Sequence, residues 1–221
     1  MRTVITGMLF LSSIGLAAKT EVFERLNETA DVLSEIMAIP EKGIPQELLD
    51  KASCVVAIPG MKKAALGLGG AYGKGFMTCR RDGGWSAPVA LRVEGGSFGF
   101  QIGLSDTDVV MLVMNKNAVN KLLSSKFTLG AEGTVAAGPV GRSVTAQTDV
   151  KMNAEILSWS RSKGLFAGIA LTGATLRPDN DNNEELYGRK IGAREIVDTE
   201  KAPEATNKLL DVLNRHSPVG K

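Results

Sequence analysis

The sequence is poor in the side chains on which metal binding and nucleophilic catalysis usually depend. Its 221 residues contain one histidine, His216, and two cysteines, Cys54 and Cys79. One imidazole in a polar C-terminal tail cannot build a metal cluster and makes a poor base for a catalytic triad. We therefore expect no catalytic residues, no metal and no cofactor, and we predict that the protein is not an enzyme.

The chain also lacks an excess of charge of either sign. Its 26 Lys and Arg residues face 24 Asp and Glu residues, for a net charge of +2. Such a balance gives no strong attraction to nucleic acid, so we expect no nucleic-acid partner. Hydrophobic residues make up 43% of the chain, which at this length is typical of a globular protein with one core.

No hydrophobic run is long enough for a permanent transmembrane helix. The uncharged run Val4–Leu16 has thirteen residues, about 20 Å of helix at 1.5 Å per residue, against a hydrocarbon core of roughly 30 Å. Arg2 before the run and small residues up to Ala17 are typical of a signal peptide. We expect cleavage after Ala17, a single domain over residues 18–221, and a periplasmic or secreted location.

The two cysteines have two interpretations. An oxidising compartment would allow Cys54 and Cys79 to pair, and the 24 residues between them contain turn signals that could bring two strands together. Alternatively, they are buried thiols that act as small apolar residues. We predict that the two side chains lie close enough to pair.

Periodicity predicts a helix, then many short strands, then a last helix. Apolar residues recur at helical spacing from Val22 to Met37, and the polar face of this helix is acidic, which favours packing on a core over contact with an anionic membrane. The run 109–114 is apolar on both faces, as expected for a strand covered on both sides, and 117–123 predicts a short helix. Further strands are predicted at 89–94, 98–104, 127–137, 142–150, 154–161 and 165–171, and a last helix around 209–213.

These elements predict an α+β fold. The strand spacing and the turns between strands favour a mainly antiparallel β-sheet closed into a barrel or sandwich, with N- and C-terminal helices. A parallel βαβ arrangement is excluded because the intervening helices are missing.

Three motifs imitate functional sites. Residues 95–99 match G-x-S-x-G around Ser97, but the helix that must follow a nucleophile elbow is replaced by an alternating run, so we expect Ser97→Ala to leave function intact. The glycines of 67–75 do not have the spacing of a phosphate-binding loop. Asp179, Asp181 and Asn183 begin like a calcium loop that later positions do not complete, which favours an Asx-rich surface turn.

Residues 52–197 resemble the SYLF domain, a lipid-binding module. The resemblance rests on fragments in the same order along the chain: 55–59 leading into Lys62 and Lys63, GAYGKGF (70–76), GWSAP (84–88), GGSFGFQIG (95–103), SKFTLG (125–130), GPVGR (138–142), SWSRSKGLFAG (158–168) and LYG (186–188). It implies binding of acidic phospholipids, phosphoinositides in eukaryotic members, sometimes actin binding, and no established enzymatic activity. Eukaryotic members use a basic N-terminal helix for membrane contact, whereas the helix here is acidic, and a signal peptide would remove actin from reach.

The predicted function is therefore lipid or membrane-surface binding without catalysis. If 154–163 is extended, Trp159, Arg161 and Lys163 share one face and present an indole beside two cations, which suits a membrane interface. Lys62 and Lys63 form a second candidate contact. The alternatives are that Trp159 belongs to the core and the cations pair with carboxylates, and that the domain is a structural or protein-interaction module of the cell envelope with an unknown partner.

Overall fold

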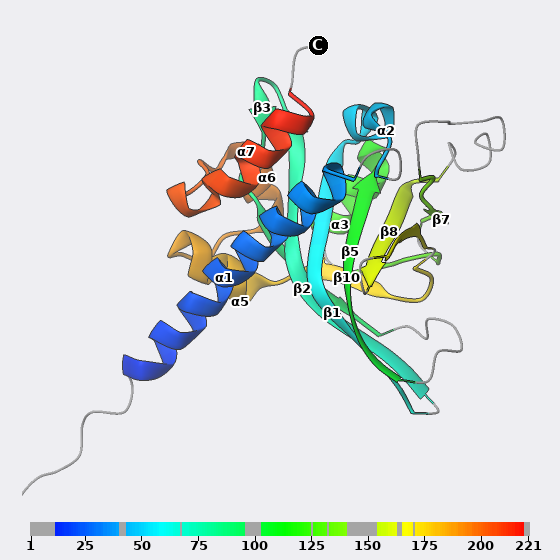
Figure 1. Cartoon of the computed structure of the whole chain (residues 1–221). Coiled ribbons are helices and arrows are strands. Elements are labelled where there is room, and N and C mark those ends of the chain that lie inside the picture. Colours follow the sequence, from blue (N-terminus) through cyan, green and yellow to red (C-terminus); the bar gives the residue numbers. More distant parts are fainter. Residues whose placement is uncertain are drawn as a thin grey trace, which may run out of the picture.

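A computed structural model describes residues 12–39, 43–66, 68–95, 103–124, 126–131, 133–140, 154–162, 165–169 and 171–218. Figure 1 shows a strongly curled sheet with helices on both sides. The helices are α1 (Ser12–Met37), α2 (Gln46–Lys51), α3 (Lys116–Ser124), α5 (Asn180–Tyr187), α6 (Ala193–Thr199), the 3-10 turn η2 (Glu204–Thr206) and α7 (Asn207–His216). The strands are β1 (Cys54–Leu66), β2 (Leu68–Arg81), β3 (Gly84–Trp85), β4 (Val89–Glu94), β5 (Gly103–Val113), β6 (Phe127–Thr128), β7 (Val135–Ala137), β8 (Ile156–Ser162), β9 (Leu165–Gly168) and β10 (Thr175–Pro178).

The predicted α+β class is confirmed, with the sheet forming a half-barrel. Its strand order is β6-β10-β4-β2-β1-β5-β8-β7, with β3 beside β2 and β9 beside β8. All described pairs are antiparallel except β7 with β8. The segment predicted as one strand over 127–137 is instead two short strands, β6 and β7, at opposite ends of this order. Consecutive residues thus connect the two outer strands of the curl.

The central strands are buried on both faces, which explains their continuous apolar runs. On β5, Val109, Met111 and Val113 belong to one hydrophobic cluster, while Val110 and Leu112 belong to the other. Alternate side chains of a strand point to opposite faces, so a strand between two helical layers must be apolar throughout. The prediction of a strand over 109–114 covered on both sides is confirmed.

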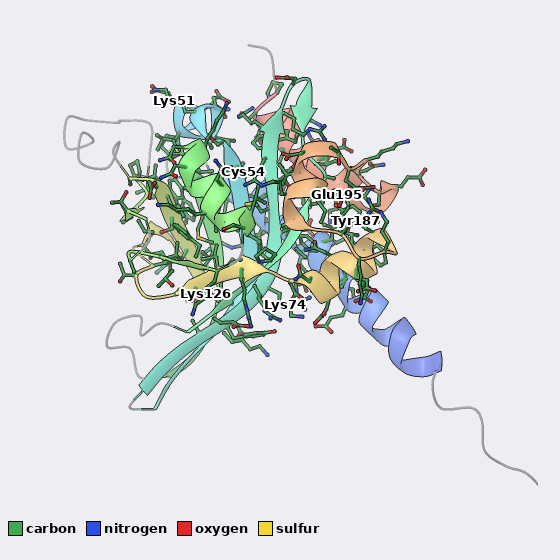
Figure 2. The ribbon with its side chains drawn as sticks, turned by 180° about the vertical axis from the view of Figure 1, so that it is seen from behind. Lys51, Cys54, Lys74, Lys126, Tyr187 and Glu195 are labelled. Atoms are coloured by element: carbon green, nitrogen blue, oxygen red, sulfur yellow. A yellow bond between two sulfur atoms is a disulfide. The ribbon has the colours of Figure 1, made fainter. Side chains whose placement is uncertain are left out.

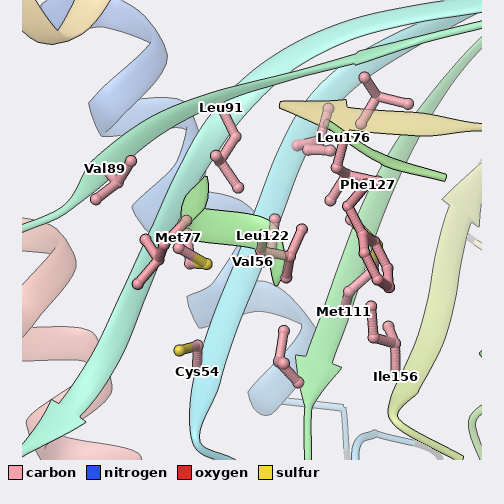
Figure 3. Close-up of a cluster of buried hydrophobic side chains, with 14 of the residues drawn as sticks. Cys54, Val56, Met77, Val89, Leu91, Met111, Leu122, Phe127, Ile156 and Leu176 are labelled. Carbon is pink, nitrogen blue, oxygen red and sulfur yellow. The ribbon is translucent and has the colours of Figure 1, made fainter. Parts of the chain in front are cut away.

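Each face of the sheet has its own hydrophobic core. Figure 3 shows the first cluster, where Met77, Leu91 and Met111 meet Leu122 of α3 and Phe127. The second cluster joins the opposite face to α1, α2 and α7. In α1 the residues that recur at helical spacing are buried: Val22, Leu26, Ala30, Leu33 and Ile36. The helix predicted over 22–37 therefore packs on the core, as expected.

A bulge bends β1 at Pro59 and Gly60. The pairing register shifts between Ala57 and Lys62 against β2, and between Ile58 and Met61 against β5. Gly60 has a φ of 53° and its N–H donates to Asp108 Oδ1 at 2.9 Å. Bulges increase strand twist and bend the strand, and beyond this one β1, β2 and β5 leave the body as a ribbon (Figure 1).

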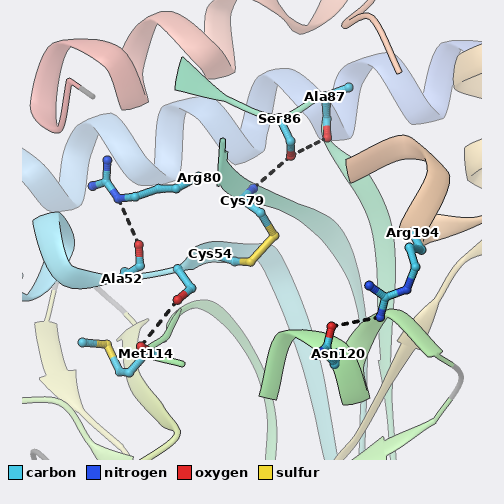
Figure 4. Close-up of a disulfide and its surroundings, with 10 residues drawn as sticks. Ala52, Cys54, Cys79, Arg80, Ser86, Ala87, Met114, Asn120 and Arg194 are labelled. Atoms are coloured by element: carbon cyan, nitrogen blue, oxygen red, sulfur yellow. Dashed lines mark hydrogen bonds between the residues drawn. A yellow bond between two sulfur atoms is a disulfide. The ribbon is translucent and has the colours of Figure 1, made fainter. Parts of the chain in front are cut away.

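A disulfide joins Cys54 and Cys79. This confirms the prediction that the two side chains lie close enough to pair. The two residues are direct cross-strand partners on β1 and β2. Figure 4 shows the bond among the hydrogen bonds of Ser86 and Arg80. The interpretation of the cysteines as unpaired buried thiols is therefore wrong.

Other predicted elements are confirmed in part. Helix α3 covers the predicted 117–123, and β4, β8 and β9 lie within or near the predicted 89–94, 154–161 and 165–171. The predicted strand 142–150, most of 98–104, and Ser97 lie outside the described residues. None of the described helices is long and apolar enough to cross a membrane.

Candidate anion-binding site

A pocket of about 490 Å³ opens beside strands β4 and β10, between the end of α3 and the start of α6. Four of its lining residues are cationic: Arg92, Lys126, Arg177 and Arg194. The lining has no carboxylate among the described residues. Leu123, Pro178 and Ala193 supply apolar surface, and Ser124 and Asn180 supply polar groups. A small concave surface with this charge suits an anionic group.

Sheet register places the two strand arginines side by side. Arg92 on β4 and Arg177 on β10 are direct cross-strand partners. Like charges directly opposite each other destabilise a sheet unless an anion lies between them. Glu94 supplies one: its Oε1 lies 3.0 Å from Arg92 Nε and 2.8 Å from Arg177 Nη2. One carboxylate therefore serves two guanidinium groups.

The other two cations come from segments outside the sheet. Arg194 at the start of α6 donates from Nη2 to the neutral Oδ1 of Asn120 at 3.0 Å, which fixes its direction without neutralising it (Figure 4). Lys126, labelled in Figure 2, follows α3, is exposed and has no ion-pair partner among the described residues. Two of the four cations thus share the carboxylate of Glu94, and the other two have no carboxylate partner among the described residues, so the pocket carries a net positive charge.

One buried guanidinium donor at this pocket lacks a partner. Arg177 Nε is buried and donates no hydrogen bond to a described residue, whereas Arg92 Nε lies 3.0 Å from Glu94 Oε1. An unsatisfied buried donor costs roughly 1–3 kcal/mol. A guanidinium group presents planar paired donors that match the oxygens of a phosphate. A bound anion with several oxygens could accept a hydrogen bond from the Arg177 donor that has no partner among the described residues.

The residues predicted to contact lipid lie elsewhere. Trp159 and Arg161 do share one face of β8, but Trp159 belongs to the second hydrophobic cluster, and its side chain is 0% exposed. Its Nε1–H donates to Pro139 O at 3.0 Å. The expectation of an exposed indole is therefore wrong, because the segment of Gly138 and Pro139 packs against the ring: a Cβ atom at Gly138 would lie 2.0 Å from Trp159 Cε2.

Arg161 is held by carboxylates instead of facing solvent. Its Nε and Nη2 donate to Asp108 Oδ2 at 3.0 and 2.8 Å, and its Nη1 forms an ion pair with Glu35 of α1. Lys62 is exposed on the projecting ribbon. The side chains of Lys63 and Lys163 lie outside the described residues. Lipid contact by these cations stays a prediction.

The Asx-rich surface turn predicted at 179–183 is a buried helix cap. Asp179 is 0% exposed and its side chain accepts from the backbone N–H of Asn182 at the start of α5. Lys74 Nζ lies 3.1 Å from Asp179 Oδ2. The side chain of Asn183 bonds both the N–H and the carbonyl of Ala90, as a neighbouring strand would. These groups anchor α5 to β4, and the prediction of a surface turn is wrong.

His216 ends α7, where burial and the charge of Arg215 lower its pKa. Within the part of the chain that the structure describes, no group of His, Cys, Asp and Glu side chains could hold a metal ion.

Known proteins resemble this chain over most of its length. A family model described as "Las17-binding protein actin regulator" matches residues 94–216, more than half of the chain. The chain belongs to the Ysc84 family. This confirms the SYLF resemblance of the sequence. The matched region contains Lys126, Arg177 and Arg194 of the pocket.

The relatives of this chain are longer proteins. The SH3 domain-containing YSC84-like protein 1 of Xenopus laevis is 34% identical over 178 residues, which cover 77% of this chain and 53% of the relative. The human protein of the same name is 32% identical over 196 residues, or 85% of this chain and 57% of the relative. LAS seventeen-binding protein 3 of Saccharomyces cerevisiae is 33% identical over 175 residues, with 77% and 38% covered. The chain spans about half the length, or less, of these relatives, whose names describe binding or domain content and not catalysis.

Proposed function

We propose that this chain binds the headgroups of acidic phospholipids in the pocket of Arg92, Lys126, Arg177 and Arg194, without catalysis. The observation that carries the proposal is the charge of this pocket, which four cations line, and only two of them, Arg92 and Arg177, pair with a carboxylate, that of Glu94. A phosphate diester brings one negative charge and oxygens that accept from guanidinium groups. The apolar surface of Leu123 and Ala193 beside the cations suits the carbon atoms of a headgroup.

The four cations of the pocket would contact a phosphate group in two ways, because two of them are partly buried and two are exposed. Arg92 and Arg177 are partly buried and already oriented by Glu94, so they would bind with little loss of side-chain entropy. Lys126 and Arg194 are exposed at the rim, where they would attract an anionic surface over a distance of roughly a Debye length. Binding should therefore weaken as salt is raised.

The proposed place of action is the periplasm or the exterior of the cell. The signal-peptide pattern of residues 2–17 supports export. The disulfide between Cys54 and Cys79 also favours this location, since such bonds persist in oxidising compartments. The lipid would then be met on a surface outside the cytoplasm.

Protein binding is the second candidate. It is supported by the name of the yeast relative, LAS seventeen-binding protein 3, and by the description of the family model. In this case the pocket would receive an acidic segment of a partner protein, and affinity for lipid would be incidental.

Liposome flotation separates the two candidates. Vesicles of phosphatidylcholine with phosphatidylglycerol should float the protein, and vesicles of phosphatidylcholine should float it much less. Charge reversal of the two rim cations, Lys126→Glu with Arg194→Glu, should weaken binding to the anionic vesicles more than tenfold, since each cation near an anionic surface contributes on the order of 1 kcal/mol.

The matched control reverses the same number of charges at Arg81 and Arg215. Both are exposed and neither forms an ion pair with a described residue. This control should lose much less affinity. Equal losses in both variants would show that only net charge matters, and a parent protein that stays unbound would favour the protein-interaction function.

A further inference from the structure

Three cationic residues form one row across the sheet, and two of them line the pocket. Lys74 on β2 (labelled in Figure 2), Arg92 on β4 and Arg177 on β10 are direct cross-strand partners, so their side chains leave the same face of the sheet. All three are partly buried. Like charges at adjacent positions of a sheet destabilise it unless they are neutralised. The row therefore needs anions of its own.

Two carboxylates balance this row. Lys74 Nζ lies 3.1 Å from Oδ2 of Asp179, which is buried. Glu94 Oε1 lies 3.0 Å from Arg92 Nε and 2.8 Å from Arg177 Nη2. Three cations and two carboxylates leave an excess of one positive charge. Because Asp179 neutralises Lys74, this excess lies on the two arginines that line the pocket.

Glu94 acts on the pocket from outside its lining. Its side chain is partly exposed and contacts both arginines, but it is not among the residues that line the cavity. Its cross-strand partners, Tyr72 on β2 and Thr175 on β10, are neutral. An anion that binds the two guanidinium groups would therefore enter a site that already contains one negative charge.

We infer that the pocket selects a phosphodiester, which carries one negative charge, over a phosphomonoester dianion, and that Glu94 sets this selectivity. The inference rests on the proposed function, because it takes the pocket beside β4 and β10 as the anion site. It goes further in naming the charge of the headgroup phosphate and the residue that determines it.

The preference for one charge follows from how attraction and hydration depend on charge. The attraction between an ion and a site grows in proportion to the charge of the ion, whereas the free energy needed to remove the ion from water grows with the square of that charge. A dianion therefore gains about twice the attraction of a monoanion and loses about four times the hydration free energy. A site with a small excess of positive charge binds the monoanion better.

The exposed rim of the pocket does not cancel this preference. Lys126 and Arg194 are exposed, so water and salt screen their charges within a Debye length, about 8 Å at physiological ionic strength. The two arginines beside Glu94 are partly buried, and their interactions are screened less. The inner pair therefore decides which phosphate binds, while the rim attracts anions of any kind.

The lining also suits a phosphate that has carbon on two sides. The pocket volume of about 490 Å³ lies in the range of sites for small organic ligands, so it has room for more than a phosphate group. Leu123 at the end of α3 and Ala193 at the start of α6 supply apolar surface from two different elements. A phosphodiester has two ester-linked carbon groups and a phosphomonoester has one. The pocket therefore offers apolar surface to both ester groups of a diester.

Two soluble probes test the selectivity without a membrane. Glycerophosphoglycerol is a phosphodiester, and glycerol phosphate is a phosphomonoester. At pH 8 the monoester is a dianion, since the second pKa of such a phosphate is about 6. Isothermal titration calorimetry at physiological salt should show that the parent protein binds the diester roughly threefold more tightly than the monoester.

Glu94→Gln removes the negative charge and keeps an acceptor oxygen beside the two arginines. A unit charge about 6 Å away changes affinity about threefold for each charge of the ligand, even at the dielectric constant of water. The variant should therefore raise the affinity for the diester about threefold and the affinity for the monoester about tenfold. The ratio of the two affinities is the decisive reading, because a purely structural role of Glu94 would change both alike. Glu94→Asp keeps the charge and should keep the ratio of the parent.

Asp82→Asn is the matched control for net charge. Asp82 is exposed in the turn after β2 and forms no ion pair with a described residue. Arg81, the last residue of β2, lies seven residues beyond Lys74, which is about 23 Å along the strand at roughly 3.3 Å per residue. The control should therefore change neither affinity.

Four outcomes would overturn the inference. A parent protein that binds the monoester at least as tightly as the diester would refute the selectivity and leave the anion site in place. Equal changes of both affinities in Glu94→Gln, or the same changes in Asp82→Asn, would show that Glu94 does not set it. A parent that binds neither probe but floats with anionic vesicles would place lipid contact outside this pocket. A parent that neither binds the probes nor floats would refute the proposed function as well.

Discussion

Replacement of Arg161 should destabilise the folded protein, because this side chain connects α1 to the sheet. Its Nε and Nη2 donate to Asp108 Oδ2 at 3.0 and 2.8 Å, and its Nη1 pairs with Glu35. Asp108 is further held by the N–H of Gly60 at 2.9 Å. Arg161 therefore links the helix, the bulge of β1, and strands β5 and β8.

The magnitude follows from the exposure of the partners. The side chains of Arg161 and Asp108 are 23% and 21% exposed, whereas Glu35 is 56% exposed. A hydrogen bond to a charged group contributes about 1.5–3 kcal/mol when it is well shielded, and exposed ion pairs contribute little. We expect Arg161→Met to lower the free energy of unfolding by about 2 kcal/mol, nearly all of it from the Asp108 contact. Arg161→Glu should lower the free energy of unfolding by about 3 kcal/mol, because the new carboxylate would also be repelled by the carboxylates of Asp108 and Glu35.

Urea denaturation followed by far-UV circular dichroism measures this effect. A loss of about 2 kcal/mol should lower the melting temperature by roughly 4–8 °C for a chain of this size. Arg81→Met is the matched control, since Arg81 is an exposed strand arginine without an ion-pair partner among the described residues. An Arg161→Met protein as stable as the parent would refute the reasoning. Liposome flotation of the Arg161→Met protein, under conditions in which it is folded, would test lipid contact by Arg161 separately from its effect on stability.

Three further predictions concern the sheet, the disulfide and the histidine. Gly75→Ala should lower stability by more than about 2 kcal/mol in thermal melts, because its Cβ would lie 2.0 Å from a backbone oxygen, whereas Gly70→Ala has open space and should change little. Replacing Cys54 and Cys79 by serine should lower stability by about 3 kcal/mol in urea, and an unchanged midpoint would contradict the chain-entropy estimate. His216 should titrate by NMR below the ordinary value of about 6.5, since burial and Arg215 lower its pKa. His216 therefore binds a proton more readily in the unfolded chain than in the folded protein. Its contribution to the free energy of unfolding is present above about pH 6.5 and is lost as the pH falls through the folded pKa. A raised pKa in the folded protein would contradict this prediction.

The outer layers of the fold could be predicted from periodicity along the chain. The spacing of Val22, Leu26 and Ala30 is enough to orient α1, because a helix that covers a core must repeat its apolar residues every three or four positions. The doubly apolar run of β5 likewise predicts cover on both faces. Both inferences depend only on neighbours within one element.

Exposure of β8 could not be predicted in this way. Alternation correctly placed Trp159 and Arg161 on one face. Whether that face meets water depends on other segments of the chain: Gly138 and Pro139 pack against the indole, and Glu35 of α1 pairs with Arg161. The alternative in which Trp159 belongs to the core and Arg161 pairs with carboxylates was open from the sequence, and only packing could decide it.

The sequence by itself determined the α+β class, the family, and the positions of the long helix and the central strands, because these depend on local periodicity and on ordered motifs. Only the tertiary structure assembled the pocket. Arg92, Lys126, Arg177 and Arg194 come from four separate segments, and in a chain with 26 Lys and Arg residues nothing marks these four as neighbours. Their charges meet because β10, which follows β9 in the chain, pairs with β4 at the other side of the sheet and brings α6 beside the end of α3.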